Sequence, residues 1–220
     1  MKNIAIIAGG NSSEYEVSMK SGKNIYDEVD ENRYNKYLVI LKGRDWHVEI
    51  GEEKFPVDKN DFSFTRNGEK ILFDFAYITI HGVPGENGLL QGYLDMMGVP
   101  YGCCNVLASA LTFDKHTCNT YLKSYGVNVA DSVMLIRGMA YDVNEIINEV
   151  GLPCFVKPNA EGSSFGVTKV KEASAIQPAI AKAFSEGREV VIESFIDGTE
   201  VTCGCYKTAD KEVVFPLTEV

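Results

Sequence analysis

The sequence predicts an α/β protein in which a parallel sheet with helices on its faces comes first and an α+β unit follows. Short apolar runs, such as residues 3–8 and 37–41, alternate with stretches of helical spacing up to about residue 102. Beyond Val99-Pro100-Tyr101-Gly102, two helical stretches follow one another and closely spaced strands come after them. We therefore expect a first domain at residues 1–102 and a second unit after it.

Local signals predict the first strand and the first helix. Residues 3–8 (NIAIIA) form a continuous apolar run, which is typical of a strand buried on both faces. Gly9-Gly10 ends the run, and Ser13 with Glu16 fits a capping box that opens a helix reaching about residue 29. One face of this helix is expected to carry Val17, Ile25 and Val29, with small Ser21 and Gly22 between them.

The rest of the first domain is predicted to add strands and one more helix. The expected strands are residues 37–41, 46–50, 54–57 and a buried strand within 71–80. A glycine-rich loop at 81–88 leads into a helix at 89–97, in which Glu86-Asn87-Gly88 is expected to cap the first turn.

The second unit mixes helices with strands that follow one another closely. Its expected helices are residues 105–111, 113–125, 142–150 and 173–185. Its expected strands are residues 132–135, 153–156, 167–170, 189–196, 201–206 and 213–217. A sheet that begins at Glu189 is expected to be left unfinished at Val220.

Composition describes an ordinary globular protein and argues against some partners. The chain has 220 residues, 45% of them hydrophobic and 24% charged, and a formal net charge of −10. Nucleic acids and anionic membranes need a basic surface, so neither is expected as a partner. The sequence has no apolar run long enough to span a bilayer and no signal segment, so we expect a cytoplasmic protein.

The six cysteines do not suggest a disulfide framework. None forms a C-x-x-C pair, and no secretion signal accompanies them. Cys154, Cys203 and Cys205 lie in strand-like runs and are expected to be small core residues. Zinc binding by Cys103-Cys104 and His116 is a weak alternative, because their spacing is not that of zinc ligands.

The stretch from Lys157 to Gly166 (KPNAEGSSFG) combines groups that suit a phosphate. It lies between two apolar runs and holds two glycines, two serines and one lysine. Glycines let backbone N–H groups approach a ligand, serines add hydroxyl donors, and the lysine adds charge. A solvated hairpin turn is an equally good explanation from composition alone. The sequence has neither a P-loop nor a dinucleotide fingerprint, so a nucleotide would bind by another device.

Five further side chains are candidates for chemistry, and each has an ordinary structural alternative. Glu14 and His81 follow predicted strands at the sheet edge where α/β proteins bind ligands. Glu14 also fits an acidic first helical turn, and His81 a structural hydrogen bond. From its neighbours in the sequence, Lys115 is expected to be a solvated lysine on a helix. Glu193 and Glu200 can meet an adenine amino group and a ribose hydroxyl, or they are exposed strand-end acids.

In order along the chain, five blocks resemble the D-alanine–D-alanine ligases of the ATP-grasp superfamily. The blocks are residues 9–18 (GGNSSEYEVS), 81–88 (HGVPGENG), 109–115 (SALTFDK), 156–166 (VKPNAEGSSFG) and 192–196 (IESFI). The resemblance implies a Rossmann-like domain at 1–102, a central ATP-grasp subdomain at 103–192 and the start of an incomplete C-terminal ATP-grasp subdomain at 193–220. Asn87 and Ser194 replace the family's usual Asp and Lys, and Ser194 weakens one adenine contact.

The resemblance also implies a reaction and its residues. ATP phosphorylates the carboxylate of one D-alanine, and the amine of a second attacks the acyl phosphate to give the dipeptide for peptidoglycan precursor synthesis. The implied catalytic residues are Glu14, His81 and Ser163. The implied nucleotide-binding residues are Lys115, Lys157, Glu161, Ser164, Glu193, Ile196 and Glu200.

Other features follow from the resemblance alone. Family members continue for roughly another domain, so the Mg²⁺ ligands are expected beyond Val220 and none within this chain. The 220-residue chain alone is therefore expected to lack ligase activity. A homodimer through the first domain is expected. The alternatives are a ligase that makes D-alanyl-D-serine or D-alanyl-D-lactate, another ATP-grasp carboxylate–amine ligase, and a non-catalytic nucleotide-binding or assembly module.

Overall fold

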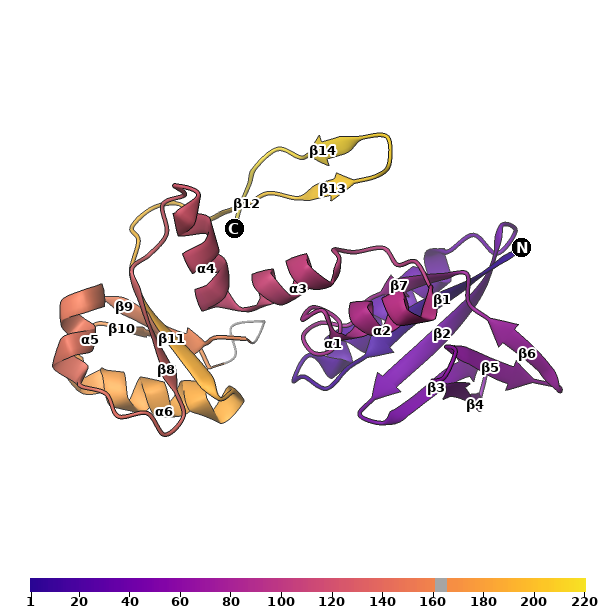
Figure 1. The fold of residues 1–220 in the computed structure, drawn as a ribbon, viewed down its shortest axis with the longest axis horizontal. Coiled ribbons are helices and arrows are strands. Elements are labelled where there is room, and N and C mark those ends of the chain that lie inside the picture. The colour runs from indigo at the N-terminus through magenta and orange to yellow at the C-terminus, as the bar shows by residue number, and fades with distance from the viewer. Residues whose placement is uncertain (161–165) are drawn as a thin grey trace.

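Two β-sheets, each with a hydrophobic core of its own, organise the chain (Figure 1). The computed structural model describes residues 1–160 and 166–220. The first core draws its residues from positions 5–101 and the second from positions 133–192. The two cores therefore draw on separate stretches of the chain.

The first lobe contains a seven-stranded sheet and two helices. Its elements are β1 (Lys2–Gly9), α1 (Tyr15–Glu28), β2 (Tyr34–Lys42), β3 (Asp45–Ile50), β4 (Glu53–Asp58), β5 (Ser63–Arg66), β6 (Glu69–Leu72), β7 (Phe75–Ile78) and α2 (Leu89–Met97). The strand order is β6-β5-β4-β3-β2-β1-β7.

Part of this sheet is parallel, as expected from the sequence, and the rest is antiparallel. β1 runs parallel to β2 and β7, and the other neighbouring strands are antiparallel. The reason is the length of the connections: β2 ends at Lys42 and β3 begins at Asp45, whereas a parallel crossover needs about a dozen residues. The expected run at 71–80 divides at Phe73 and Asp74 into β6 and β7.

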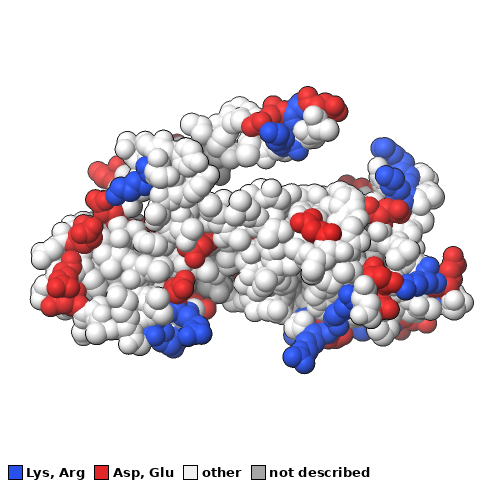
Figure 2. Space-filling model, viewed as in Figure 1, with Lys and Arg blue, Asp and Glu red and all other residues white. Residues whose placement is uncertain are grey.

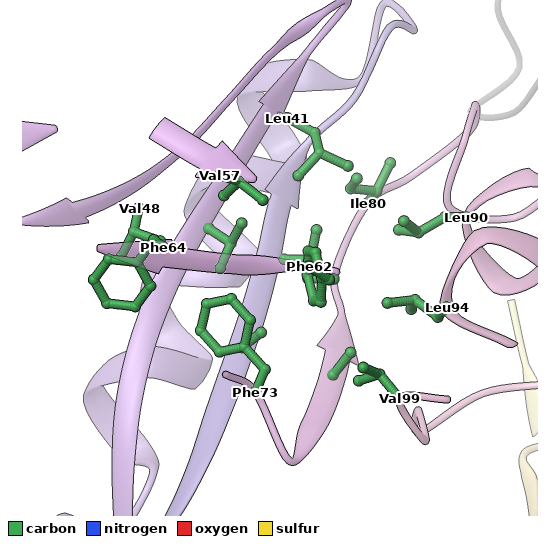
Figure 3. Close-up of a cluster of buried hydrophobic side chains, with 14 residues drawn as sticks. Leu41, Val48, Val57, Phe62, Phe64, Phe73, Ile80, Leu90, Leu94 and Val99 are labelled. Atoms are coloured by element: carbon green, nitrogen blue, oxygen red, sulfur yellow. The ribbon is translucent and has the colours of Figure 1, made fainter. Parts of the chain in front are cut away.

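The core of the first lobe lies between the sheet and α2. Its buried side chains come from six strands, from α2 and from the segments beside them; those labelled in Figure 3 are Leu41, Val48, Val57, Phe62, Phe64, Phe73, Ile80, Leu90, Leu94 and Val99. Phe64 stacks on Phe73 with ring centroids 5.7 Å apart. Figure 3 shows Leu90 and Leu94 pointing from α2 towards Phe62 and Ile80. This packing fixes α2, and with it the loop at 81–88.

Small side chains face inward from α1, as expected for Gly22 but not for Val17. Ser18 and Gly22 are its buried residues, whereas Val17 is 50% exposed. The capping box is also wrong: Glu14 occupies the cap position without a side-chain cap bond, and its N–H donates instead to Ser12 Oγ at 3.2 Å. The small residues are needed because the helix lies very close to β1.

The second lobe is built on a four-stranded antiparallel sheet. Its elements are α3 (Val106–Phe113), α4 (Lys115–Ser124), β8 (Ser132–Ile136), α5 (Val143–Val150), β9 (Cys154–Pro158), β10 (Thr168–Val170), the 3-10 turn η1 (Ala173–Ala175), α6 (Ile176–Glu186) and β11 (Glu189–Ser194). Side chains of α5 and α6, including Ile146 and Ile180, fill the core on one face of the sheet.

Strand β11 lies inside this sheet, in the order β10-β9-β11-β8. The expectation of an unfinished sheet starting at Glu189 is therefore wrong, because β11 pairs on one side with β9 and on the other with β8, which comes much earlier in the chain. Cys154 of β9 is fully buried, as expected, and burial raises the pKa of its thiol.

The last residues form two small ribbons: β12 (Val201–Thr202) pairs with β15 (Thr218–Glu219), and β13 (Cys205–Lys207) pairs with β14 (Glu212–Val214). Cys203 and Cys205 are exposed, so the prediction that they are core residues is wrong. Figure 2 shows open space between the β13–β14 hairpin and the two lobes, with basic and acidic side chains intermingled on the face in view. Among the helices of the described residues, none is long and apolar enough to cross a membrane.

The contact between α1 and β1 yields a stability test at Gly22. A Cβ added there would lie 2.6 Å from the Ala8 Cβ, so Gly22→Ala overpacks the contact. Overpacking costs about 1–3 kcal/mol, which outweighs the roughly 0.5–1 kcal/mol that alanine contributes in a helix. We expect a lower free energy of unfolding in a denaturant titration.

Gly92→Ala in α2 is the matched control. A Cβ there would meet Val106 Cγ2 at an ordinary 3.8 Å, so this variant keeps the helix benefit without the clash. Equal stability changes at both glycines would contradict the close approach of α1 to β1.

Candidate active site

A buried serine joins the ends of two parallel strands in the first lobe. Ser18 Oγ accepts a hydrogen bond from Gly9 N–H and donates one to the Thr79 carbonyl, both at 2.9 Å. Gly9 ends β1 and Thr79 follows β7, so this hydroxyl fixes the two chain segments that carry Glu14 and His81. The role of Ser18 could not be predicted from the sequence, because a serine within a helix gives no local sign of such partners.

Glu14 and His81 lie on either side of one further hydroxyl group. Ser12 Oγ donates to the His81 carbonyl at 2.8 Å and accepts from Glu14 N–H at 3.2 Å. Glu14 is 5% exposed. Gly82 has φ of 73°, and a Cβ there would lie 2.7 Å from Ser12 Cβ, so a side chain cannot be accommodated. The structure therefore brings the two predicted residues together at the carboxyl edge of the sheet.

The loop that carries His81 is held at both ends. Glu86 Oε2 accepts from Gly82 N–H at 2.6 Å, and Gln91 of α2 donates from Nε2 to the Gly85 carbonyl at 2.5 Å. Asn87 Oδ1 accepts from Leu89 N–H, as expected for a residue that caps α2. The His81 ring lies with Nε2 3.4 Å from Ser21 Oγ on α1. These contacts position the imidazole against the middle of α1.

In the second lobe, Lys157 and Glu193 form an ion pair on neighbouring strands. Lys157 Nζ lies 2.5 Å from Glu193 Oε2, and both side chains are largely buried. Asn119 of α4 donates from Nδ2 to Glu193 Oε1 at 3.1 Å. Since Val156 and Ile192 point to the helix-covered core, the alternation of strand side chains places Lys157 and Glu193 on the opposite face, towards α4.

Lys115 lies on the same side of the sheet. It is the first residue of α4, one helical turn before Asn119, and its Nζ donates to the Asn159 carbonyl at 3.2 Å. The two lysines predicted to bind phosphate therefore lie on the same side of the sheet, and the Lys115 amine contacts the chain two residues after Lys157. The expectation from neighbouring residues that Lys115 is a solvated lysine is wrong, because Asn159 lies against it in the fold and accepts from its amine.

Other predicted nucleotide contacts are less well defined. Ile196 is 66% exposed and follows β11, and Glu200 is exposed, with its carbonyl accepting from Val220 N–H at 3.1 Å. The structure does not bring these two into the Lys157–Glu193 contact. Glu161, Ser163 and Ser164 lie outside the described residues.

The two lobes meet at a cavity of about 350 Å³. Val83 and Asn87 line it from the first lobe, and Asp114, Ala160 and Glu189 from the second. Residues 1–160 and 166–220 contain no group of three or more His, Cys, Asp or Glu side chains placed to hold a metal ion. The described residues of the site supply carboxylates, amines, an imidazole and hydroxyl groups.

The Lys157–Glu193 pair yields a prediction about stability. Removing one member of a buried pair strands the other charge and costs about 3–5 kcal/mol, whereas an apolar replacement of both members is nearly neutral. We expect Glu193→Ala to lower the free energy of unfolding more than the double variant Lys157→Met/Glu193→Leu does. Denaturant unfolding measures both, and a double variant that is the less stable of the two would contradict a desolvated pair.

Family models and curated relatives match nearly the whole chain. The family described as D-ala D-ala ligase N-terminus matches residues 3–104, and the one described as D-ala D-ala ligase C-terminus matches residues 121–220. The D-alanine–D-alanine ligase of Phocaeicola vulgatus is 61% identical over the whole chain, which spans 68% of that relative.

Solved structures show the same fold. A D-alanine–D-alanine ligase from Bacillus anthracis, complexed with ATP, matches all of the chain with a TM-score of 0.77 and 28% identity, and 67% of its own chain is covered. The VanG D-Ala:D-Ser ligase from Enterococcus faecalis matches 99% of the chain with a TM-score of 0.84 and 31% identity, and 69% of it is covered. On the strength of these matches, the chain belongs to the D-alanine–D-alanine ligase family.

Proposed function

We propose that this chain binds ATP and D-alanine and serves the ATP-dependent joining of two D-alanine molecules. The observation that carries the proposal is the position of Lys115 and Lys157 on the same side of the sheet, with Lys157 next to the buried carboxylate of Glu193. Ammonium groups in a shielded site stabilise phosphate oxygens more than they do in water. A carboxylate acceptor such as Glu193 suits the amino group of adenine.

The first lobe supplies the amino-acid site in this proposal. The buried Glu14 carboxylate pairs with the ammonium of the first D-alanine, and His81, fixed by Ser12, stands beside its carboxylate. Ser163 and Ser164, with Glu161, contact the transferring phosphate. The carboxylate oxygen attacks the terminal phosphorus of ATP and ADP leaves; the amine of the second D-alanine then attacks the acyl carbon, and phosphate leaves with the former carboxylate oxygen.

Two other functions compete with this proposal. A D-alanyl-D-serine ligase is represented by the 31% identical VanG match, but the 61% identical relative is named a D-alanine–D-alanine ligase, which favours D-alanine as the second substrate. A nucleotide-binding module without catalysis requires no amino-acid site, so D-alanine binding that depends on Glu14 separates it from a ligase. We also propose that Mg²⁺ accompanies the bound nucleotide.

Titration calorimetry with ATP and with D-alanine tests the two halves of the site separately. Lys157→Met removes a charged donor, and we expect ATP affinity to fall about 10–100-fold while D-alanine affinity stays unchanged. Glu14→Gln is expected to have the reverse selectivity.

Two neighbouring charges serve as matched controls. Lys123→Met removes an exposed lysine of α4, and Glu16→Gln removes an exposed carboxylate of α1. Neither is expected to change the affinity for either ligand. If Lys157→Met binds ATP as the unmodified chain does, the proposed nucleotide site is wrong.

We further propose a homodimer through residues 1–102. Leu89 and Met96 lie seven positions apart on α2, so they share one helix face, and they are 63% and 76% exposed. Contact with a second copy explains why this face is apolar. Met96→Glu is therefore expected to lower the mass measured by light scattering to that of one chain. Glu69→Lys, on β6, is the control and is expected to leave the mass unchanged. A single-chain mass for the unsubstituted protein would contradict the dimer.

A further inference from the structure

Asn159 lies beside the two lysines predicted to bind phosphate, and both its side chain and its backbone are hydrogen-bonded. Its side chain is fully buried. Its Nδ2 donates to Asp114 Oδ2 at 2.8 Å and to Glu189 Oε2 at 2.9 Å, and its Oδ1 accepts from His116 N–H at 2.9 Å. One amide group thus joins the start of α4 to the start of β11.

The backbone of Asn159 makes the same connection. Its N–H donates to the Glu189 carbonyl at 3.0 Å, and its carbonyl accepts from Lys115 N–H at 3.2 Å. The same carbonyl accepts from Lys115 Nζ at 3.2 Å. Since Asn159 stands two positions after Lys157, both lysines are tied to one short piece of chain.

These bonds cap α4 from a distant part of the sequence. The first N–H groups of a helix have no partner within the helix. Here Lys115 and His116 N–H donate to the carbonyl and side chain of Asn159, and Thr117 N–H donates to Asp114 Oδ1 at 2.8 Å. Asp114 is in turn held by Asn159. The helix therefore cannot slide or rotate on the sheet without breaking several buried hydrogen bonds.

We propose that Asn159 is a positioning residue for nucleotide binding: it sets the separation of the Lys115 and Lys157 amines, and so their fit to the phosphates, without touching the nucleotide. This inference rests on the proposed function. It predicts that loss of the Asn159 amide weakens contacts to phosphate while contacts to adenine, made by Glu193 on another part of β11, are kept.

The two carboxylates that contact Asn159 explain why this position holds an amide. Two carboxylates, from Asp114 and Glu189, point at the same nitrogen, and only a group with two N–H donors satisfies both. Aspartate at this position would replace both donors with a third negative charge. Alanine would leave the two carboxylates and one helix N–H without this partner.

The test compares affinities for ATP and for adenosine by titration calorimetry on the full chain. For Asn159→Ala we expect ATP affinity to fall about tenfold or more and adenosine affinity to stay the same, with a larger loss for Asn159→Asp. Ile180→Val is the control, since it thins the core of the same lobe without reaching the network. It is expected to lower the melting temperature and to leave both affinities unchanged.

A second pair of variants leaves Asn159 in place, which keeps the test valid should its substitution prevent folding. Glu189→Gln retains a carbonyl acceptor for the amide and is expected to keep most of the ATP affinity, whereas Glu189→Ala is expected to lose it. Unchanged ATP affinity in Asn159→Ala and Glu189→Ala, or equal losses for ATP and adenosine, would overturn the inference. Failure of the unmodified chain to bind ATP would overturn the proposed function itself.

Discussion

The docking of the α4 N-terminus on the second sheet is the constraint on which the candidate nucleotide site depends. A helix presents its unpartnered N–H groups at its first turn, and these are costly to bury without acceptors. In this chain the acceptors come from Asn159, at the end of β9, and from Asp114. The requirement to satisfy buried N–H groups therefore also fixes where Lys115 stands relative to Lys157.

The first lobe solves a similar problem with smaller groups. α1 approaches β1 so closely that a glycine and a serine are the residues it buries. The Ser18 hydroxyl uses this proximity, because it accepts from one strand end and donates to the other. In both lobes a single buried polar side chain bridges a helix and two strands, and the reactive groups are attached directly beside that bridge. Rigidity at these points comes from hydrogen bonds that water cannot replace.

Local patterns predicted the elements well and long-range contacts poorly. The helix expected at 89–97 is α2, Leu89–Met97, because its apolar spacing and the Asn87-Gly88 turn leave little choice. The parallel part of the first sheet is confined to β2, β1 and β7, because the two-residue connection between β2 and β3 is too short for a parallel crossover. Cys203 and Cys205 have strand-like neighbours but face solvent, because burial depends on what packs against a strand.

The candidate site shows the same division. Glu14, His81, Lys115 and Lys157 follow from motifs, as residues of the right chemistry in the right order. What the motifs omit is the set of side chains that hold them. Asn159 contacts residues more than forty positions away, and Ser18 joins Thr79 across sixty-one positions. No periodicity encodes such pairs, because they are consequences of the tertiary fold.

Charge balance in the second lobe explains how an acidic chain can favour an anionic ligand. The net charge of −10 is unfavourable for a triphosphate at long range, but salt screens such interactions beyond about 10 Å. At close range the ammonium of Lys157 has three donors, of which the Glu193 carboxylate engages one face. That carboxylate orients the amine while leaving capacity for phosphate oxygens. Because the Lys157–Glu193 pair is close to neutral, Lys157 alone attracts phosphate weakly. Lys115 and Lys157 must therefore act together, and the distance and angle between them determine whether they can.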